Sequence, residues 1–334
     1  MLDMTVGIPR GLFFYTFYPM WKTFFHELGV RVIVSPQTTK NILDAGVEET
    51  VTDACIPIKV YHGHVEALKE QADYIFIPRM VNYRGKQTFC PKFLGLPDMV
   101  RYSLQDLPPI ISPRVAVRGS KKRLFEAFCE TGIYFTDDRK RIKQAGQAAL
   151  EAHQAYHAML QGGMSVKNAL RAVDDRPVKE TPNPQTDSLR LAILGYPYII
   201  NDQYISMNLT EHLENYGVEY FTYENLPFDA VYKQKYWNSK SVFWYFSDTI
   251  LKAAAYVFEG HVPVDGVIHV TAFGCGPDFL VNRLLEGQAK EKGIPFLTAT
   301  IDEQSGSSGM LTRLEAFCDM ISRQQRLEGG NTSA

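Results

Sequence analysis

The sequence lacks the features that mark several large classes of protein. No apolar run approaches the roughly 20 residues that a membrane-spanning helix needs. Basic and acidic residues nearly balance, 35 against 37, so the formal net charge of -2 provides no overall positive field for nucleic acid. The opening residues Met1–Thr5 contain no basic segment and no secretory apolar run. We therefore expect a cytoplasmic protein that binds neither membranes nor nucleic acid.

Nucleotide-binding motifs are absent too. Gly274 and Gly276 form a G-x-G pair, but Phe279 stands where the dinucleotide motif needs its third glycine. The segment Ser305–Gly309 is rich in serine and glycine, yet no G-K-[ST] follows it, so it is no P-loop. We therefore do not expect the chain to bind ATP or a dinucleotide by itself.

Cysteine is scarce. Five cysteines, an odd and widely spaced set, do not form a disulfide framework. No C-x₂-C pair of the kind that holds structural zinc is present. We expect reduced thiols, available for other chemistry.

What the sequence does contain is a regular alternation of β-branched runs and helical periodicity. This alternation predicts an α/β protein with parallel crossovers. The length of 334 residues favours two units over one. The predicted divisions are an N-terminal α/β half (1–115), a helical connection with a Pro-rich linker (116–187), a C-terminal α/β half (188–325) and a disordered tail (326–334).

The second half repeats the plan of the first. Three predicted strands of the first half have counterparts in the second: Thr5–Pro9 with Leu189–Pro197, Val30–Val34 with Val218–Phe221, and Asp73–Ile77 with Asp265–Val270. The predicted fold is therefore two Rossmann-like parallel-sheet halves, an internal pseudo-repeat, facing a central cleft. Ligands of such sheets bind outside the carboxyl ends of the strands.

The stretch Val267–Pro277 is the most informative one in the chain. A buried strand ends at Cys275, which stands between Gly274 and Gly276, and Pro277 then opens a helix. At such a corner the free backbone N–H groups and the helix dipole favour a thiolate. The two glycines leave room for a bulky group to approach the backbone.

Two further cysteines share this setting. Cys55 and Cys90, like Cys275, are followed by a proline within two positions, which predicts three helix N-termini. Cys90 and Cys275 also follow corresponding strands, so packing of the halves face to face would bring the thiols together. The alternative is that all three are small buried side chains. For Cys129 and Cys318, each in an Ala-Phe-Cys helical stripe, we expect the core.

Three converging thiolates suit zinc or an iron–sulfur cluster. A [4Fe–4S] cluster usually takes four cysteines. With three, one iron would take a non-protein ligand or a residue of another chain. Such an open site indicates chemistry or switching.

Weaker candidates surround this set. Lys92 would place a positive charge beside a cluster, or would simply lie on the surface. His62 and His64 point to different helix faces, so we expect one in the core or beside the site and the other in solvent. Asp302 and Glu303 fall at the end of the last strand, either at a catalytic edge or as a charge pair at a helix N-terminus.

The aromatic segment Tyr232–Phe246 is amphipathic. We expect it to form core or a dimer face rather than a ligand platform.

Five segments, in order along the chain, carry a family resemblance: Gly7–Leu12, Cys55–His64, Cys90–Asp98, Phe273–Asp278 and Thr312–Phe317. They resemble the acyl-CoA dehydratase activase-related family, also described as CoA-substrate-specific enzyme activase-related. That family is similar in plan to 2-hydroxyacyl-CoA dehydratase subunits and to double-cubane-cluster proteins of anaerobic metabolism.

The resemblance implies that Cys55, Cys90 and Cys275 ligate a [4Fe–4S]-type cluster, alone or as part of a larger one. It also implies a separate ATP-dependent activase or reductase as partner. One departure is the loop Gln304–Gly309, which is often a His-containing, acidic stretch in such proteins.

Three functions follow as expectations. The first is an iron–sulfur protein in low-potential electron transfer or reduction, coupled to the ATP-dependent partner. The second is a dehydratase-like subunit whose open iron binds a CoA ester. The third is a non-enzymatic scaffold or a zinc-binding subunit. A small reducible substrate or an acyl-CoA is the expected ligand, and a homodimer is an alternative to a monomer.

Overall fold

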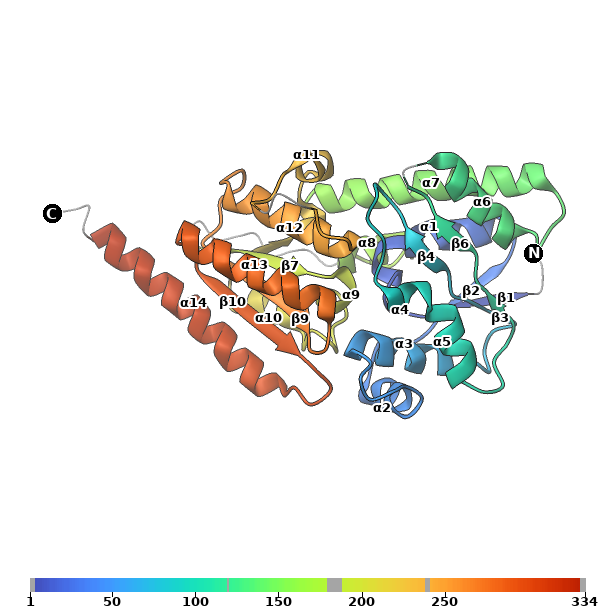
Figure 1. Ribbon diagram of the computed structural model, residues 1–334, viewed down its shortest axis with the longest axis horizontal. Helices are drawn as coiled ribbons and strands as arrows, with labels where there is room; N and C mark the ends of the chain where they lie inside the picture. The colour runs from blue at the N-terminus through green and yellow to red at the C-terminus, as the bar shows by residue number, and fades with distance from the viewer. Residues whose placement is uncertain (1–3, 119, 179–187, 238–240, 331–334) are drawn as a thin grey trace.

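The computed structural model describes residues 4–118, 120–178, 188–237 and 241–330. It has two α/β lobes side by side, coloured blue to green and yellow to red in Figure 1. The N-terminus lies at the far end of the first lobe and the C-terminus at the far end of the second (Figure 1). Helices α3 and α4 of the first lobe, and α9 of the second, lie near the boundary.

The first lobe contains a four-stranded parallel sheet in the order β2-β1-β3-β5. A second sheet of two parallel strands pairs β4 with β6. The elements in chain order are β1 (Thr5–Ile8), α1 (Phe14–Glu27), β2 (Arg31–Val34), α2 (Lys40–Glu48), α3 (Ile56–Glu66), β3 (Tyr74–Phe76), β4 (Arg79–Asn82), α4 (Pro91–Leu94), α5 (Leu96–Ser103), β5 (Ile110–Ile111) and β6 (Arg114–Ala116). Trp21, Phe24, Phe25 and Phe76 pack as an aromatic core beside the sheet.

The second lobe contains a four-stranded parallel sheet in the order β8-β7-β9-β10. Its elements in chain order are β7 (Arg190–Gly195), α9 (Pro197–Ile200), α10 (Leu209–Asn215), β8 (Glu219–Thr222), the 3₁₀ turn η1 (Tyr223–Asn225), α11 (Phe228–Lys233), α12 (Tyr245–Phe258), β9 (Gly266–Ala272), α13 (Gly276–Lys292), β10 (Phe296–Ile301) and α14 (Ser307–Gly330). Every residue of β9 is buried, including the polar His269 and Thr271, as is usual for a central strand of a covered parallel sheet.

The two sheets have the same topology, which confirms the predicted Rossmann-like halves. In each, the strand order is second, first, third and fourth in chain sequence. The details repeat as well. Asp73 accepts a hydrogen bond from the backbone N–H of Thr5 (2.7 Å), and Asp265 accepts one from Arg190 (2.6 Å). Each aspartate thus joins the loop before a third strand to the start of a first strand.

The helical connection bridges the two lobes. It consists of α6 (Lys121–Gly132), α7 (Arg139–Gln161) and α8 (Val166–Val173), and α7 lies along one side of the first lobe and reaches the second (Figure 1). Tyr156 on α7 donates to the carbonyl of Tyr15 (2.8 Å), whereas the carbonyl of Leu160 accepts from Asn225 in the second lobe (2.9 Å). The helical connection therefore forms hydrogen bonds with both lobes, in addition to linking them along the chain.

The structure describes part of the predicted Pro-rich linker and part of the predicted tail. The first residues of the linker are held to α1, because Asp174 accepts hydrogen bonds from Tyr18 (2.8 Å) and Lys22 (2.9 Å). Residues 179–187 lie outside the described part. The predicted disordered tail is helical at its start. Helix α14 begins at Ser307 and continues to Gly330, which includes residues 326–330 of that tail, and residues 331–334 are not described. Because Ser307 and Ser308 are helical, the Ser305–Gly309 segment forms no extended anion-binding loop.

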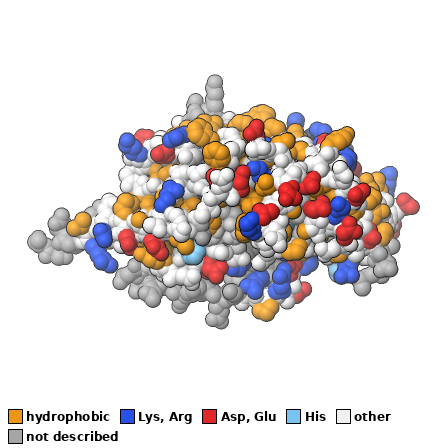
Figure 2. Space-filling model, turned by 90° about the horizontal axis from the view of Figure 1, so that it is seen from below, with side chains coloured by type: hydrophobic (Ala, Val, Ile, Leu, Met, Phe, Trp, Pro, Cys, Tyr) orange, Lys and Arg blue, Asp and Glu red, His pale blue; other side chains and the backbone are white. Residues whose placement is uncertain are grey.

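The surface carries no large patch of one charge on the face that Figure 2 shows. Acidic and basic side chains alternate across it, in keeping with the nearly balanced composition (Figure 2). Every helix in the described ranges is too short or too polar to cross a lipid bilayer.

Candidate functional site: a cysteine-lined cavity between the lobes

Cys55, Cys90 and Cys275 line one cavity at the boundary of the two lobes. The cavity is small, about 30 Å³, which is room for one or two water molecules. Its other walls are apolar or aromatic: Leu12, Pro57, Ile58, Phe89, Phe93, Tyr196, Tyr198, Trp244, Tyr245, Phe246 and Pro277.

All three cysteines are helix N-caps, as the prolines predict. Cys55 precedes α3, Cys90 precedes α4 and Cys275 precedes α13, each with an extended backbone and a proline in the first helical turn. In the sheet topology β3 and β9 are corresponding third strands, and Cys275 directly follows β9, whereas β4 lies between β3 and Cys90.

A fourth helix N-cap completes the wall. Helix α12 precedes the third strand of its sheet, just as α3 precedes the third strand of the other. Its N-cap is Trp244, which lines the same cavity. Four corresponding corners of the repeat thus meet here, and they present three thiols and one indole.

Backbone hydrogen bonds across the boundary hold these corners in register. Thr88, two residues before Cys90, forms a parallel bridge with Trp244. Its N–H donates to the carbonyl of Phe243 (3.1 Å), and its carbonyl accepts from the N–H of Tyr245 (2.8 Å). The loop that carries Cys90 is therefore fixed to the other lobe by main-chain bonds, which do not depend on side-chain rotamers.

The predicted stabilisation of a thiolate is wrong for the chain by itself. Burial raises the pKa of the Cys55, Cys90 and Cys275 thiols, and the carboxylate of Asp278 raises that of Cys275 further. The positive charge of Lys92 and nearby backbone N–H groups lower the pKa of the Cys55 and Cys90 thiols, but by less than burial raises it. The helix N-termini are present as predicted, yet desolvation in an apolar cavity has the larger effect.

The glycines beside Cys275 have the two roles that their residue type allows. Gly274 has a φ of 73°, in the left-handed region that favours glycine, so it makes the turn at the end of β9. A Cβ added at Gly274 or Gly276 would meet no heavy atom within 4 Å. The space in front of this corner is therefore open, as the sequence predicts.

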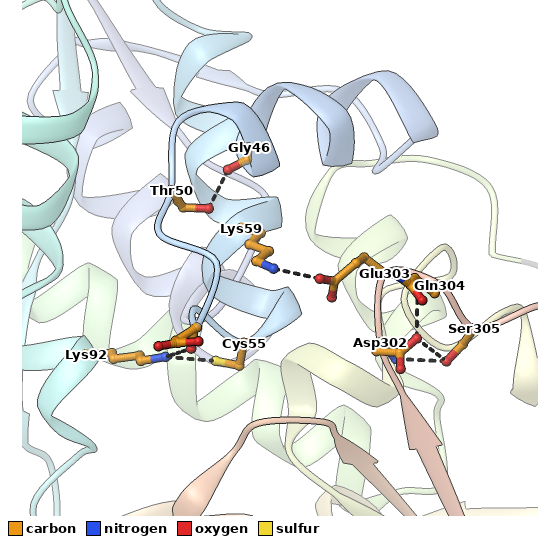
Figure 3. Close-up of polar contacts among 10 residues, drawn as sticks. Gly46, Thr50, Cys55, Lys59, Lys92, Asp302, Glu303, Gln304 and Ser305 are labelled. Atoms are coloured by element: carbon orange, nitrogen blue, oxygen red, sulfur yellow. Dashed lines mark hydrogen bonds and ion pairs between the residues drawn. The ribbon is translucent and has the colours of Figure 1, made fainter.

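Two lysines bring positive charge to the first cysteine, as Figure 3 shows. Lys92 Nζ lies 4.0 Å from Cys55 Sγ and 3.3 Å from the carbonyl of Asp53. Lys59, on α3, is buried and pairs with Glu303 of the other lobe at 2.7 Å. Lys92 was predicted, but Lys59 was not, because lysine is rarely buried unless it is paired.

Asp302 and Glu303 have structural partners outside the cavity. Asp302 accepts from the N–H of Gln304 (2.9 Å) and from the hydroxyl of Ser305 (2.8 Å), which forms the turn before α14 (Figure 3). Glu303 holds the two lobes together through Lys59. Neither carboxylate lines the cysteine cavity, so neither has the geometry of a catalytic group there.

The prediction that one of the paired histidines faces solvent is wrong. His62 and His64 are 1% and 0% exposed, because α3 packs against other elements on all sides. His62 Nδ1 donates to the carbonyl of Ile58 (2.8 Å) within the helix.

His64 belongs to a buried chain of hydrogen bonds that crosses between the lobes. The N–H of Arg10 donates to Ser35 Oγ (2.8 Å), and the Ser35 hydroxyl donates to Nδ1 of His64 (3.0 Å). Nε2–H of His64 then donates to Thr38 Oγ1 (2.9 Å), whose hydroxyl donates to the carboxylate of Asp202. Each hydroxyl donates once, so a neutral imidazole satisfies the chain.

This chain makes stability depend on pH. Burial, together with the smaller effect of the Arg10 charge, lowers the pKa of His64 to about 3. Between that value and about 6.5 the unfolded chain takes up a proton that the folded protein does not. The free energy of unfolding should therefore be highest above pH 6.5 and fall by about 1.4 kcal/mol per pH unit for this residue as the pH decreases.

Urea unfolding of metal-free protein between about pH 7.5 and about pH 5.5 measures this slope. His64→Gln should flatten it by about one proton equivalent. His26→Gln is the matched control, because His26 is on the surface of α1 with its side chain 82% exposed. Equal slopes in the parent and His64→Gln would contradict the assignment.

The residues that the sequence did not predict are the aromatic walls. Tyr196 and Tyr198 follow β7 in Gly195-Tyr196-Pro197-Tyr198, the counterpart of the Pro9 turn after β1. Trp244 and Tyr245 belong to the aromatic segment that we expected to be core or a dimer face. The repeat could have indicated both groups, since they occupy corresponding strand ends and helix starts.

In the described ranges, no group of three or more His, Cys, Asp or Glu side chains is arranged to hold one ion. The three thiols line a common cavity without converging on one point. This geometry gives no support to the mononuclear zinc alternative, and the cluster stays a prediction.

The comparisons with known proteins give one family. The family model described as "CoA enzyme activase uncharacterised domain (DUF2229)" matches residues 5–226, more than half of the chain. Cys55 and Cys90 lie within the matched range, and Cys275 lies beyond it. A search of curated proteins finds no match. The chain therefore belongs to the CoA enzyme activase uncharacterised domain family.

Proposed function

We propose that this protein binds a [4Fe–4S]-type cluster at Cys55, Cys90 and Cys275 and transfers electrons at low potential in partnership with an ATP-dependent activase. The observation that supports this most is the meeting of three thiols, from both lobes, in one apolar cavity. The donor set fits such a cluster, because thiolates are its usual ligands. When bound, the cluster would supply one-electron transfer.

The chain's own residues have definable tasks around that group. Phe89, Phe93 and Tyr198 would exclude water, which keeps electrostatic interactions strong. Lys92 would offset negative charge near Cys55. The backbone N–H groups at the starts of α3, α4 and α13 would donate hydrogen bonds to sulfur, which raises the potential of a cluster.

The buried thiols of the metal-free chain fit this proposal. Three thiolates in an apolar cavity repel one another and lose hydration, so the cavity disfavours them without a cationic group. Iron would provide that charge, since a coordinating thiol is deprotonated by its metal. The family description, which names CoA enzyme activases, supports an activase as the partner.

The proposal is tested by metal analysis of protein purified and reconstituted without oxygen. We expect about four irons and as many acid-labile sulfides per chain, with an EPR signal after reduction by dithionite. Zinc is measured in the same samples. Protein that takes up neither iron nor sulfide, or that holds one equivalent of zinc alone, would exclude the proposal and favour a scaffold.

A further inference from the structure

A second cavity between the lobes is lined by several cationic side chains. It measures about 290 Å³, close to the lower limit for small-molecule sites. Arg10 enters it from the end of β1, and Gln37 and Thr38 from the end of β2. Asn201 and Asp202, after α9, close it from the second lobe. It therefore lies at the carboxyl ends of strands, where ligands of α/β sheets bind.

Helix α8 supplies the cationic wall. Lys167 and Arg171 are four residues apart, so they lie on the same face of the helix, and both line the cavity. Arg176 follows α8 and lines it as well. Together with Arg10, the cavity has four cationic side chains, and they come from two segments far apart in the sequence.

Acidic side chains neutralise part of that charge, because Arg176 pairs with Asp174 and Lys167 Nζ lies 3.8 Å from Glu211 Oε2. Asp174 is already occupied, since it pairs with Lys22 (2.9 Å) and Arg176. Asp202 is 1% exposed and accepts from Thr38 and from the N–H groups of Tyr204 and Ile205 (both 3.0 Å). Both carboxylates are committed to partners within the protein.

Two guanidinium groups of this cavity, those of Arg10 and Arg171, have N–H donors available for a ligand. Arg10 donates through Nε to the carbonyl of Ser35 (3.1 Å) and stacks on Phe14, which positions its terminal nitrogens. Arg171 forms no ion pair with any other residue that the structure describes. A guanidinium presents paired donors that match the oxygens of a phosphate group.

We propose that this cavity binds a small molecule carrying a diphosphate or two neighbouring phosphate groups, held between Arg10 and Arg171. The amide side chain of Gln37 provides further donors to phosphate oxygens. The site does not depend on the cysteine cavity. The loop after β1 adjoins both spaces, because Arg10 lines this one and Leu12 lines the other.

Calorimetric titration of the full chain with inorganic pyrophosphate tests the proposal. Because the site does not depend on the cysteine cavity, either iron-loaded or iron-free protein can be used. We expect saturable binding that weakens with added salt. Arg171→Gln and Arg10→Gln should each raise the dissociation constant about tenfold or more, since hydrogen bonds to charged groups are the strong ones. Arg123→Gln, an exposed residue on α6, is the matched control and should bind as the parent does.

Three outcomes would overturn the proposal. They are absence of pyrophosphate binding to parent protein, equal affinity of Arg171→Gln and Arg123→Gln, and equal binding of citrate, which would indicate a general anion site. Because Arg171 lies on α8 and its replacement removes no contact within the core, the variant should fold, and its urea midpoint checks this.

Discussion

Cys55→Ser should reduce bound iron from about four atoms per chain to below about one, with a parallel loss of sulfide. A serine hydroxyl is a poor replacement for a thiolate, and the cluster would keep only two protein ligands. Cys55 is also the cysteine nearest to Lys92, so the charge around it is already arranged for an anionic ligand. Iron and sulfide assays after anaerobic reconstitution give the result directly.

The chain contains its own control for this experiment. Cys129 lies on α6, half-buried, and is not part of the cavity. Cys129→Ser makes the same chemical change and should leave iron and sulfide as in the parent. Matching urea midpoints would show that both variants are folded. If Cys55→Ser and Cys129→Ser retain equal iron, the three cysteines do not hold the cluster.

His269→Leu should lower the free energy of unfolding by about 1–3 kcal/mol, the usual cost of leaving a buried polar side chain without its partner. His269 on β9 and Asp278 in the first turn of α13 are both completely buried, with His269 Nε2 3.3 Å from Asp278 Oδ1. Neither of these atoms has a well-oriented hydrogen bond in the described part of the chain, so each depends on the other electrostatically. Without the imidazole, the carboxylate stays buried and unpaired.

A double variant separates this effect from loss of packing. In His269→Leu/Asp278→Leu the unpaired carboxyl group is gone, and stability should return most of the way to the parent value. Glu286→Gln, which breaks the exposed pair with Arg283 on the same helix, should cost less than about 1 kcal/mol. Urea unfolding measures all four proteins. Equal losses in His269→Leu and Glu286→Gln, or no recovery in the double variant, would contradict this role.

The fold could be predicted because its signals are local. β-Branched runs such as Val267–Val270, and glycines such as Gly29 and Gly217 that end α1 and α10 with positive φ, mark strands and helix ends one by one. Proline after cysteine predicted three N-caps for the same reason. The internal repeat then paired Cys90 with Cys275, and in the sheet topology β3 and β9 are corresponding third strands.

Properties that depend on packing could not be predicted in this way. The pKa of Cys275 depends on how completely the other lobe covers it, which no local pattern records. The burial of His64 has the same origin, because its partner Asp202 is far away in sequence. The cationic cavity joins Arg10 to Arg171 through an arrangement of α8 that periodicity does not specify.

Trp244 makes the two halves of the repeat differ at the cysteine cavity. Two like halves related by an approximate twofold would be expected to offer four equivalent ligands, yet the corner that corresponds to Cys55 is an indole. The symmetry is broken at one place only among these four helix N-caps. A cluster bound here would have a cysteine ligand at three of these helix N-caps and no ligand at the fourth. Exchange with a substrate or redox partner would then be confined to the side that Trp244 covers. A single residue, Trp244, thus makes the two halves of the repeat unequal at this site.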